Sequence, residues 1–107
     1  MSQLPKPPKT FDEFSKRFPK IALAWGDVAA AGKQGPLDER TARLVKLGIA
    51  IGAMREGATH SSVRKALAAG VTEDELDQVV ALSVGTLGFP AAVAAFSWIR
   101  DELIKRR

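Results

Sequence analysis

Apolar residues of this chain recur at helical spacing in successive stretches, which are separated by glycine or proline. In the first stretch, Phe11, Phe14 and Phe18 stand at positions i, i+3 and i+7, so their side chains share one helix face. Thr10 precedes them, and Glu13 follows Thr10 by three residues. This spacing predicts a helix that begins with a capping box, in which each of these two side chains accepts a hydrogen bond from the other residue's backbone N–H.

A second helix is expected over residues 20–31. Pro19 suits the first turn of a helix, and Gly32 opens a break in the chain. Trp25 and Val28 are the side chains that we expect to face inward from this helix.

The next stretch predicts a longer helix, with Asp38 as its N-cap and its end near Met54 or Arg55. Its apolar residues occupy nearly every side of the helix beyond Leu47; the full set is Leu44, Val45, Leu47, Ile49, Ile51 and Met54. A helix that is apolar around most of its circumference is normally buried. We therefore expect this segment to be a central, buried helix.

A short helix should follow from Thr59 or His60 to Ala69, because Gly70 suits the residue just past a helix end. Thr72 and Glu75 then have the spacing of a second capping box. This box predicts that a helix begins there and continues over residues 73–86.

The last helix is expected over residues 91–105, after a break at Gly88. No segment shows the sustained alternation of apolar and polar residues that is typical of a strand. The chain is therefore predicted to be all-α, a compact bundle of five to six helices in a single domain of residues 1–107. Residues 1–9, which are rich in proline and lysine, are expected to form an extended arm, and residues 10–107 the helical core.

Composition then excludes several kinds of chemistry. The 107 residues include no cysteine, so the chain has no thiolate nucleophile, disulfide or cysteine metal site, and its one histidine is too few for a histidine metal cluster. We expect neither a metal nor another cofactor. No apolar stretch reaches the ~18 residues of a membrane-spanning helix, and the first residues lack the apolar segment of a secretion signal. The sequence thus predicts a cytoplasmic protein that does not contact membranes.

The net charge of +4 raises the question of nucleic-acid binding. Ala66, Gly70 and Val71 have the spacing of a helix-turn-helix. In that case residues 72–75 and Asp77 would open the recognition helix, and their carboxylates would repel phosphates. The favourable interaction of acids with a helix N-terminus explains the same residues. We therefore expect no nucleic-acid partner.

Residues 55–62 are the segment in which reactive groups gather. His60 can act as a general acid or base near neutral pH, and Arg55 can hold a carboxylate by paired hydrogen bonds. In the alternative interpretation, Thr59 caps a helix, His60 lies in its exposed first turn, and Arg55 is a solvated helix end. Both interpretations stay open. A serine hydrolase is not expected, because no nucleophile-elbow glycines surround Ser61 and Ser62.

Small residues suggest self-association. Alanines on the last predicted helix would let another helix approach closely, and the central helix is apolar on more sides than one set of neighbours can cover. A chain of this length seldom surrounds one of its own helices completely. We expect a homo-oligomer, although a compact bundle with small residues at its internal crossings would show the same composition.

Taken together, the motifs resemble those of the carboxymuconolactone decarboxylase and alkylhydroperoxidase-D-like family. The order and spacing of five segments between about residues 18 and 99 carry this resemblance: Phe18–Pro19, Gly35–Asp38, Arg43–Ala50, Val63–Leu76 and Gly88–Pro90. The resemblance implies an all-α protomer that assembles through its helices, commonly as a trimer or hexamer.

The resemblance also places the peroxidase site of the family on this sequence. Counting back from Gly70, the two redox cysteines of that branch fall on Arg55 and Ala58, and its histidine falls on Ser62. Its relay glutamate falls on Arg43. All four positions lack the required chemistry, and without a thiolate no sulfenic acid or disulfide cycle can run. Thiol peroxidase activity is therefore not expected.

The decarboxylase branch needs no cysteine. We hypothesise that Arg55 and Arg43, treated as two residues of the long central helix, bind the carboxylates of a small carboxylated lactone or similar acid. His60 would then supply the proton, and Ser62 or Thr59 would donate a hydrogen bond. The alternative function is a non-catalytic oligomeric member that serves as a scaffold or binds a small molecule.

Overall fold

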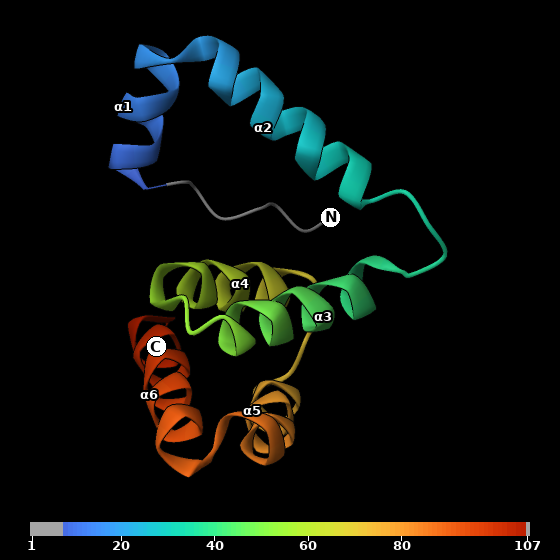
Figure 1. Cartoon of the computed structure of the whole chain (residues 1–107), viewed down its shortest axis with the longest axis vertical. Helices are drawn as coiled ribbons and strands as arrows, with labels where there is room; N and C mark the ends of the chain where they lie inside the picture. Colours follow the sequence, from blue (N-terminus) through green and yellow to red (C-terminus); the bar gives the residue numbers. More distant parts are fainter. Residues whose placement is uncertain (1–7, 107) are drawn as a thin grey trace. The chain divides into compact units, whose positions relative to one another are not determined.

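The computed structural model describes residues 8–106, and its chain divides into two compact units, residues 8–37 and residues 38–106 (Figure 1). Most of the arm expected over residues 1–9 lies outside the described residues. Six helices and no strand occur in the described part, which confirms the all-α prediction. They are α1 (Lys9–Arg17), α2 (Pro19–Gly32), α3 (Glu39–Gly52), α4 (Glu56–Ala68), α5 (Glu73–Leu87) and α6 (Phe89–Arg106).

The smaller unit consists of α1 and α2. The capping box expected at Thr10 and Glu13 is wrong, because Pro8 takes the extended conformation of an N-cap (φ −58°, ψ 149°) and the helix already begins at Lys9. No side chain caps α1. The phenylalanine stripe does form, and the rings of Phe14 and Phe18 lie 5.0 Å apart between their centroids.

Neither α1 nor α2 buries a residue. The expected inward orientation of Trp25 and Val28 is therefore wrong, since their exposed fractions are 59% and 63%. Contact with α1 leaves only Ala22 of α2 half-buried. The apolar sides of α2 have no cover within this unit.

The larger unit contains the hydrophobic core. Helix α3 packs against α4 and α5, and α6 packs against the same two helices, so that four helices surround one core (Figure 1). The buried apolar residues that pack together come from all four helices and from the turn before α5; they are Leu47, Ile51, Val63, Ala66, Val71, Leu76, Val80, Ala92, Ala95, Ile99 and Leu103.

The predicted starts of α3 and α5 are confirmed. Asp38 accepts a hydrogen bond from the Thr41 backbone N–H at 2.7 Å. At α5, the Glu75 N–H donates to Thr72 Oγ1 at 3.2 Å, and the Thr72 N–H donates to Glu75 Oε1 at 2.8 Å, which completes the capping box. The end of α4 is confirmed as well. Gly70 has φ +90°, a conformation that favours glycine, and the next N–H returns to the Ala66 carbonyl at 3.0 Å.

Helix α3 differs from its prediction on one side. Leu47 and Ile51 are fully buried, whereas Val45 and Ile49 are 46% and 65% exposed. The reason is that α4 and α5 cover only one face of α3. The expected central, buried helix is therefore half covered, and an apolar face of α3 remains exposed in this unit.

We expect Thr72→Ala to lower the free energy of unfolding by about 1 kcal/mol, because it removes one half of the α5 capping box. Thr10→Ala is the matched control, since Thr10 lies inside α1 and caps nothing. Urea unfolding at neutral pH measures both variants. Equal losses in the two variants would show that the α5 box contributes nothing specific.

We expect the carboxylates of these two helix caps to affect the stability of the fold at low pH. The Thr41 backbone N–H lowers the pKa of Asp38, and the Thr72 N–H, followed by the Arg40 guanidinium, lowers the pKa of Glu75. A carboxyl whose pKa is lower in the folded state stabilises the fold above its unfolded pKa, and this stabilisation is lost as the pH falls through the folded pKa.

The Asp38→Asn/Glu75→Gln variant keeps both caps in uncharged form. Its stability should therefore fall less steeply than that of the wild type as the pH drops below about 4, where carboxyl groups ordinarily begin to protonate. Thermal unfolding at a series of pH values measures the two slopes. Parallel slopes would contradict the assignment of this loss of stability to the Asp38 and Glu75 carboxylates.

Candidate functional site

The candidate site is a cluster of charged side chains between α4 and α6. His60 Nδ1 and Arg64 Nη1 each lie 2.8 Å from Oε1 of Glu102. Lys105 Nζ lies 3.8 Å from the same oxygen. Glu102 is only 5% exposed, so three basic side chains surround one buried carboxylate.

Helix periodicity brings these groups together. His60 and Arg64 are four residues apart and therefore share one face of α4, next to the core residues of that helix. On α6, Glu102 continues the buried row of Ala95 and Ile99. A carboxylate in that row faces α4, and burial there requires charged partners.

The Glu102 carboxylate determines which nitrogen of His60 carries a hydrogen. Oε1 accepts from the Arg64 guanidinium, which only donates, and an ionised carboxylate has no hydrogen to give. Nδ1 of His60 is therefore the donor, and in the neutral ring Nε2 keeps its lone pair. Buried carboxylates orient catalytic imidazoles in this way.

The other edge of the imidazole faces outward. His60 Nε2 lies 3.4 Å from Glu56 Oε2, and the Glu56 side chain is 62% exposed. The histidine side chain itself is 16% exposed. Nε2 thus faces an exposed carboxylate, whereas Nδ1 contacts the buried carboxylate of Glu102.

The other predicted site residues do not converge on this edge. Thr59 is fully buried, and its hydroxyl donates to the Arg55 carbonyl at 2.8 Å. Arg55 is exposed and forms the N-cap of α4. Ser62 is half-buried two residues after His60, about 200° around the helix and therefore on the opposite side.

The expected relation between Arg43 and Arg55 is wrong. The sequence predicts one helix that holds both residues, but α3 ends at Gly52. Met54 then turns the chain with φ 53°, and Arg55 starts α4 from an extended conformation. Arg43 is half-buried on α3, so the two guanidinium groups come from different helices.

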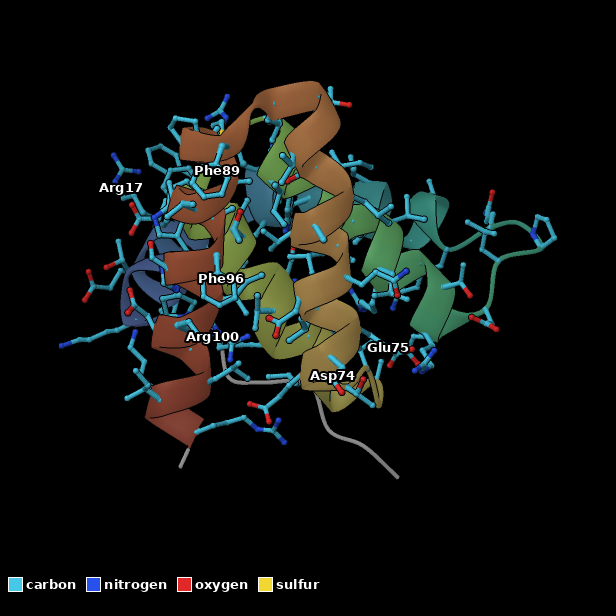
Figure 2. The ribbon with its side chains drawn as sticks, turned by 90° about the horizontal axis from the view of Figure 1, so that it is seen from below. Arg17, Asp74, Glu75, Phe89, Phe96 and Arg100 are labelled. Atoms are coloured by element: carbon cyan, nitrogen blue, oxygen red, sulfur yellow. The ribbon has the colours of Figure 1, made fainter. Side chains whose placement is uncertain are left out.

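An apolar groove of about 560 Å³ lies between α3 and α5, away from the cluster. Gly48 and Gly52 of α3 line it opposite the α5 side chains of Val79, Leu82 and Leu87. Glu75, which pairs with Arg40 and is seen near the start of α5 in Figure 2, adds a polar group to the lining. Gln78 adds another. None of the predicted site residues lines this groove.

The described part of the chain offers no cluster of three or more histidine, aspartate or glutamate side chains that could hold a metal ion. Between residues 8 and 106, no helix is both long enough and apolar enough to cross a membrane.

The family model described as carboxymuconolactone decarboxylase family matches residues 19–101. This chain belongs to that family. No curated protein and no solved structure matches it.

The family match covers α2 to α5 and most of α6. Within this carboxymuconolactone decarboxylase family chain, His60 and Arg64 lie inside the matched region and Glu102 lies one residue beyond it. Because the chain contains no cysteine, it cannot perform the thiol chemistry of the peroxidase branch.

Sequence reasoning found His60 but missed its partners Glu102 and Arg64. A signal was present, because Glu102 occupies a helical position in register with Ala95 and Ile99, where an apolar residue is expected. A charge in such a row indicates an oppositely charged partner on the facing helix.

The tautomer of His60 gives a direct test of the cluster. His60 is the single histidine of the chain, so a long-range ¹H–¹⁵N spectrum contains one imidazole. We expect the neutral ring to carry its hydrogen on Nδ1. In Glu102→Ala this preference should disappear, and stability should fall by about 2 kcal/mol because two half-buried donors lose a charged acceptor.

Glu56→Gln is the control for that experiment, because Glu56 approaches only Nε2. It should leave the Nδ1–H form in place. An Nε2–H tautomer in the wild-type protein would contradict the hydrogen-bond assignment.

Proposed function

We propose that this chain is a cysteine-independent, cofactor-free lyase that decarboxylates a small carboxylated lactone or a related acid, with His60 as its proton carrier. The observation that carries the proposal is the contact between His60 Nδ1 and the buried Glu102 carboxylate. Membership of the carboxymuconolactone decarboxylase family supports the substrate class.

The proposed reaction has two steps. The bond between the substrate carbon and its carboxylate breaks, carbon dioxide leaves, and the electron pair is delocalised toward the ring carbonyl. The imidazolium of His60 then transfers the proton on Nε2 to carbon, and solvent restores that proton. Glu102 stabilises the imidazolium between turnovers through its bond to Nδ1.

Arg55, exposed at the N-cap of α4 and five residues before His60, remains a proposed cation for a substrate carboxylate. Arg43 remains a second proposed cation, from α3. Ser62 remains a proposed donor, although it lies across α4 from His60. The Thr59 hydroxyl already donates to the Arg55 carbonyl, so it supports the position of Arg55 instead of contacting substrate.

We also propose that the chain acts as a homo-oligomer, a trimer or hexamer. Most exposed large apolar residues of the larger unit lie on α3, α5 and α6, and Met54 lies in the turn after α3. Extensive exposed apolar surface generally marks an interface. A neighbouring subunit could then enclose the accessible edge of His60.

A second candidate function is a non-catalytic oligomer that binds a small apolar molecule. The observation that favours it is the position of the α3–α5 groove, which none of the proposed catalytic residues lines. A ligand that binds there would raise the unfolding temperature without any turnover.

Turnover of carboxymuconolactone, followed by ultraviolet absorbance, tests the proposed function. We expect His60→Ala to reduce the rate by about 10²-fold or more, because the variant has no group that can transfer the proton. Ser61→Ala, one residue along the same helix, is the matched control and should retain the rate. No turnover by a folded wild-type protein would contradict the proposal and favour the binding function.

A further inference from the structure

Arg64 contacts the same carboxylate oxygen as His60, but the charge of Arg64 is constant. Its Nη1 and the Nδ1 of His60 each lie 2.8 Å from Oε1 of Glu102. A guanidinium is always protonated in proteins, whereas an imidazole gains and loses its charge near neutral pH. The two partners that α4 gives to Glu102 are therefore one permanent cation and one variable cation.

The burial of Glu102 makes this difference important. Its carboxylate is only 5% exposed, and a buried charge requires an opposite charge close to it. If His60 were the counter-ion, each loss of the imidazole proton would leave the buried carboxylate uncompensated. The imidazolium would then hold its proton firmly and would be a weak acid.

Lys105 is a poorer permanent counter-ion than Arg64. Its Nζ lies 3.8 Å from Oε1 of Glu102 and its side chain is 70% exposed, so water screens its charge. The Arg64 side chain is 33% exposed and donates a hydrogen bond to the carboxylate. Arg64 is thus the closer and better shielded of the two constant charges.

Other charged groups around His60 have less influence on its charge. Glu56 Oε2 lies 3.4 Å from Nε2, but its side chain is 62% exposed and therefore screened. Helices α3 and α6 pack against α4. Within residues 8–106, their remaining charged side chains form no ion pair with His60 or Glu102; they are Glu39, Arg40, Arg43, Lys46, Arg100, Asp101 and Arg106.

We propose that Arg64 is a positioning residue, which serves as the permanent counter-ion of Glu102 and thereby allows His60 to change its charge in each turnover. Because Arg64 compensates the carboxylate in both states of the imidazole, Glu102 stays ionised and keeps its bond to the Nδ1 hydrogen while the Nε2 proton leaves and returns. The turnover part of this assignment rests on the proposed lyase function. The charge part concerns the free protein and is measured without substrate.

The ¹H–¹⁵N signals of the single imidazole measure the charge of His60. At about pH 7.5, roughly one unit above the ordinary histidine pKa, Arg64→Met should contain several-fold more imidazolium than the wild type. Arg64→Lys keeps the charge and should retain the wild-type fraction. Lys105→Met, the matched control, removes an exposed charge beside the same oxygen and should change the fraction little. An unchanged or smaller fraction in Arg64→Met would overturn the proposal.

The Glu102→Gln background separates an effect through the carboxylate from direct repulsion between Arg64 and His60. In this background Arg64→Met should no longer change the imidazolium fraction, because no buried anion remains to be compensated. An equal increase in both backgrounds would show repulsion alone, and the proposal would be wrong.

A measurement on the wild type does not depend on the folding of any variant. The carboxyl ¹³C signal of Glu102, assigned through its bonds to the backbone, should stay at the position of an ionised carboxylate while the pH is raised and His60 loses its charge. A protonated Glu102 beside a neutral His60 would overturn the proposal.

Turnover of carboxymuconolactone tests the catalytic part. We expect Arg64→Met to lower kcat by about tenfold with little change in KM, because a firmly held proton is transferred more slowly. A raised KM with unchanged kcat would show that Arg64 binds substrate, which contradicts the positioning role. No turnover by the folded wild type would contradict the lyase function alone, since the spectra decide the charge assignment independently.

Discussion

The buried carboxylate of Glu102 is the constraint on which the candidate site depends. At 5% exposure it must be compensated, and α4 supplies His60 and Arg64 at 2.8 Å for that purpose. The same contacts link α4 to α6 on one side of the core. One charged residue thus joins the packing of the larger unit to the orientation of its only imidazole.

Helix starts were predictable from sequence where a side chain performs the capping, and not where the backbone does. Asp38 and Thr72 cap their helices as expected, because their side chains accept nearby N–H groups. Thr10 has the same spacing to its glutamate as Thr72. Pro8 nevertheless starts α1 two residues earlier through its own backbone angles. The end of α3 was missed because Met54 adopts φ 53°, which no sequence pattern marks.

Of the candidate site, only the residue on α4 that stands out in the sequence could be predicted. His60 stood out as the single histidine, but its partner lies 42 residues away on another helix. Pairing at that distance depends on how α4 and α6 pack, which helical spacing does not specify. Apolar spacing predicts one continuous helix for Arg43 and Arg55, and the turn at Met54 separates them. The exposed face of α3 was not predicted for a similar reason. Apolar residues all around a helix do not indicate which of its sides α4 and α5 will cover.

The most direct measurement of the central claim is a double-mutant cycle on carboxymuconolactone turnover, with Glu102→Gln, His60→Ala and the double variant. If Glu102 acts through His60, the double variant should turn over substrate at the same rate as His60→Ala alone, because the second change has nothing left to affect. Glu102→Gln alone should show a reduced kcat. Losses that multiply in the double variant would show that the two residues act separately, and the account of a carboxylate-held proton carrier would be contradicted.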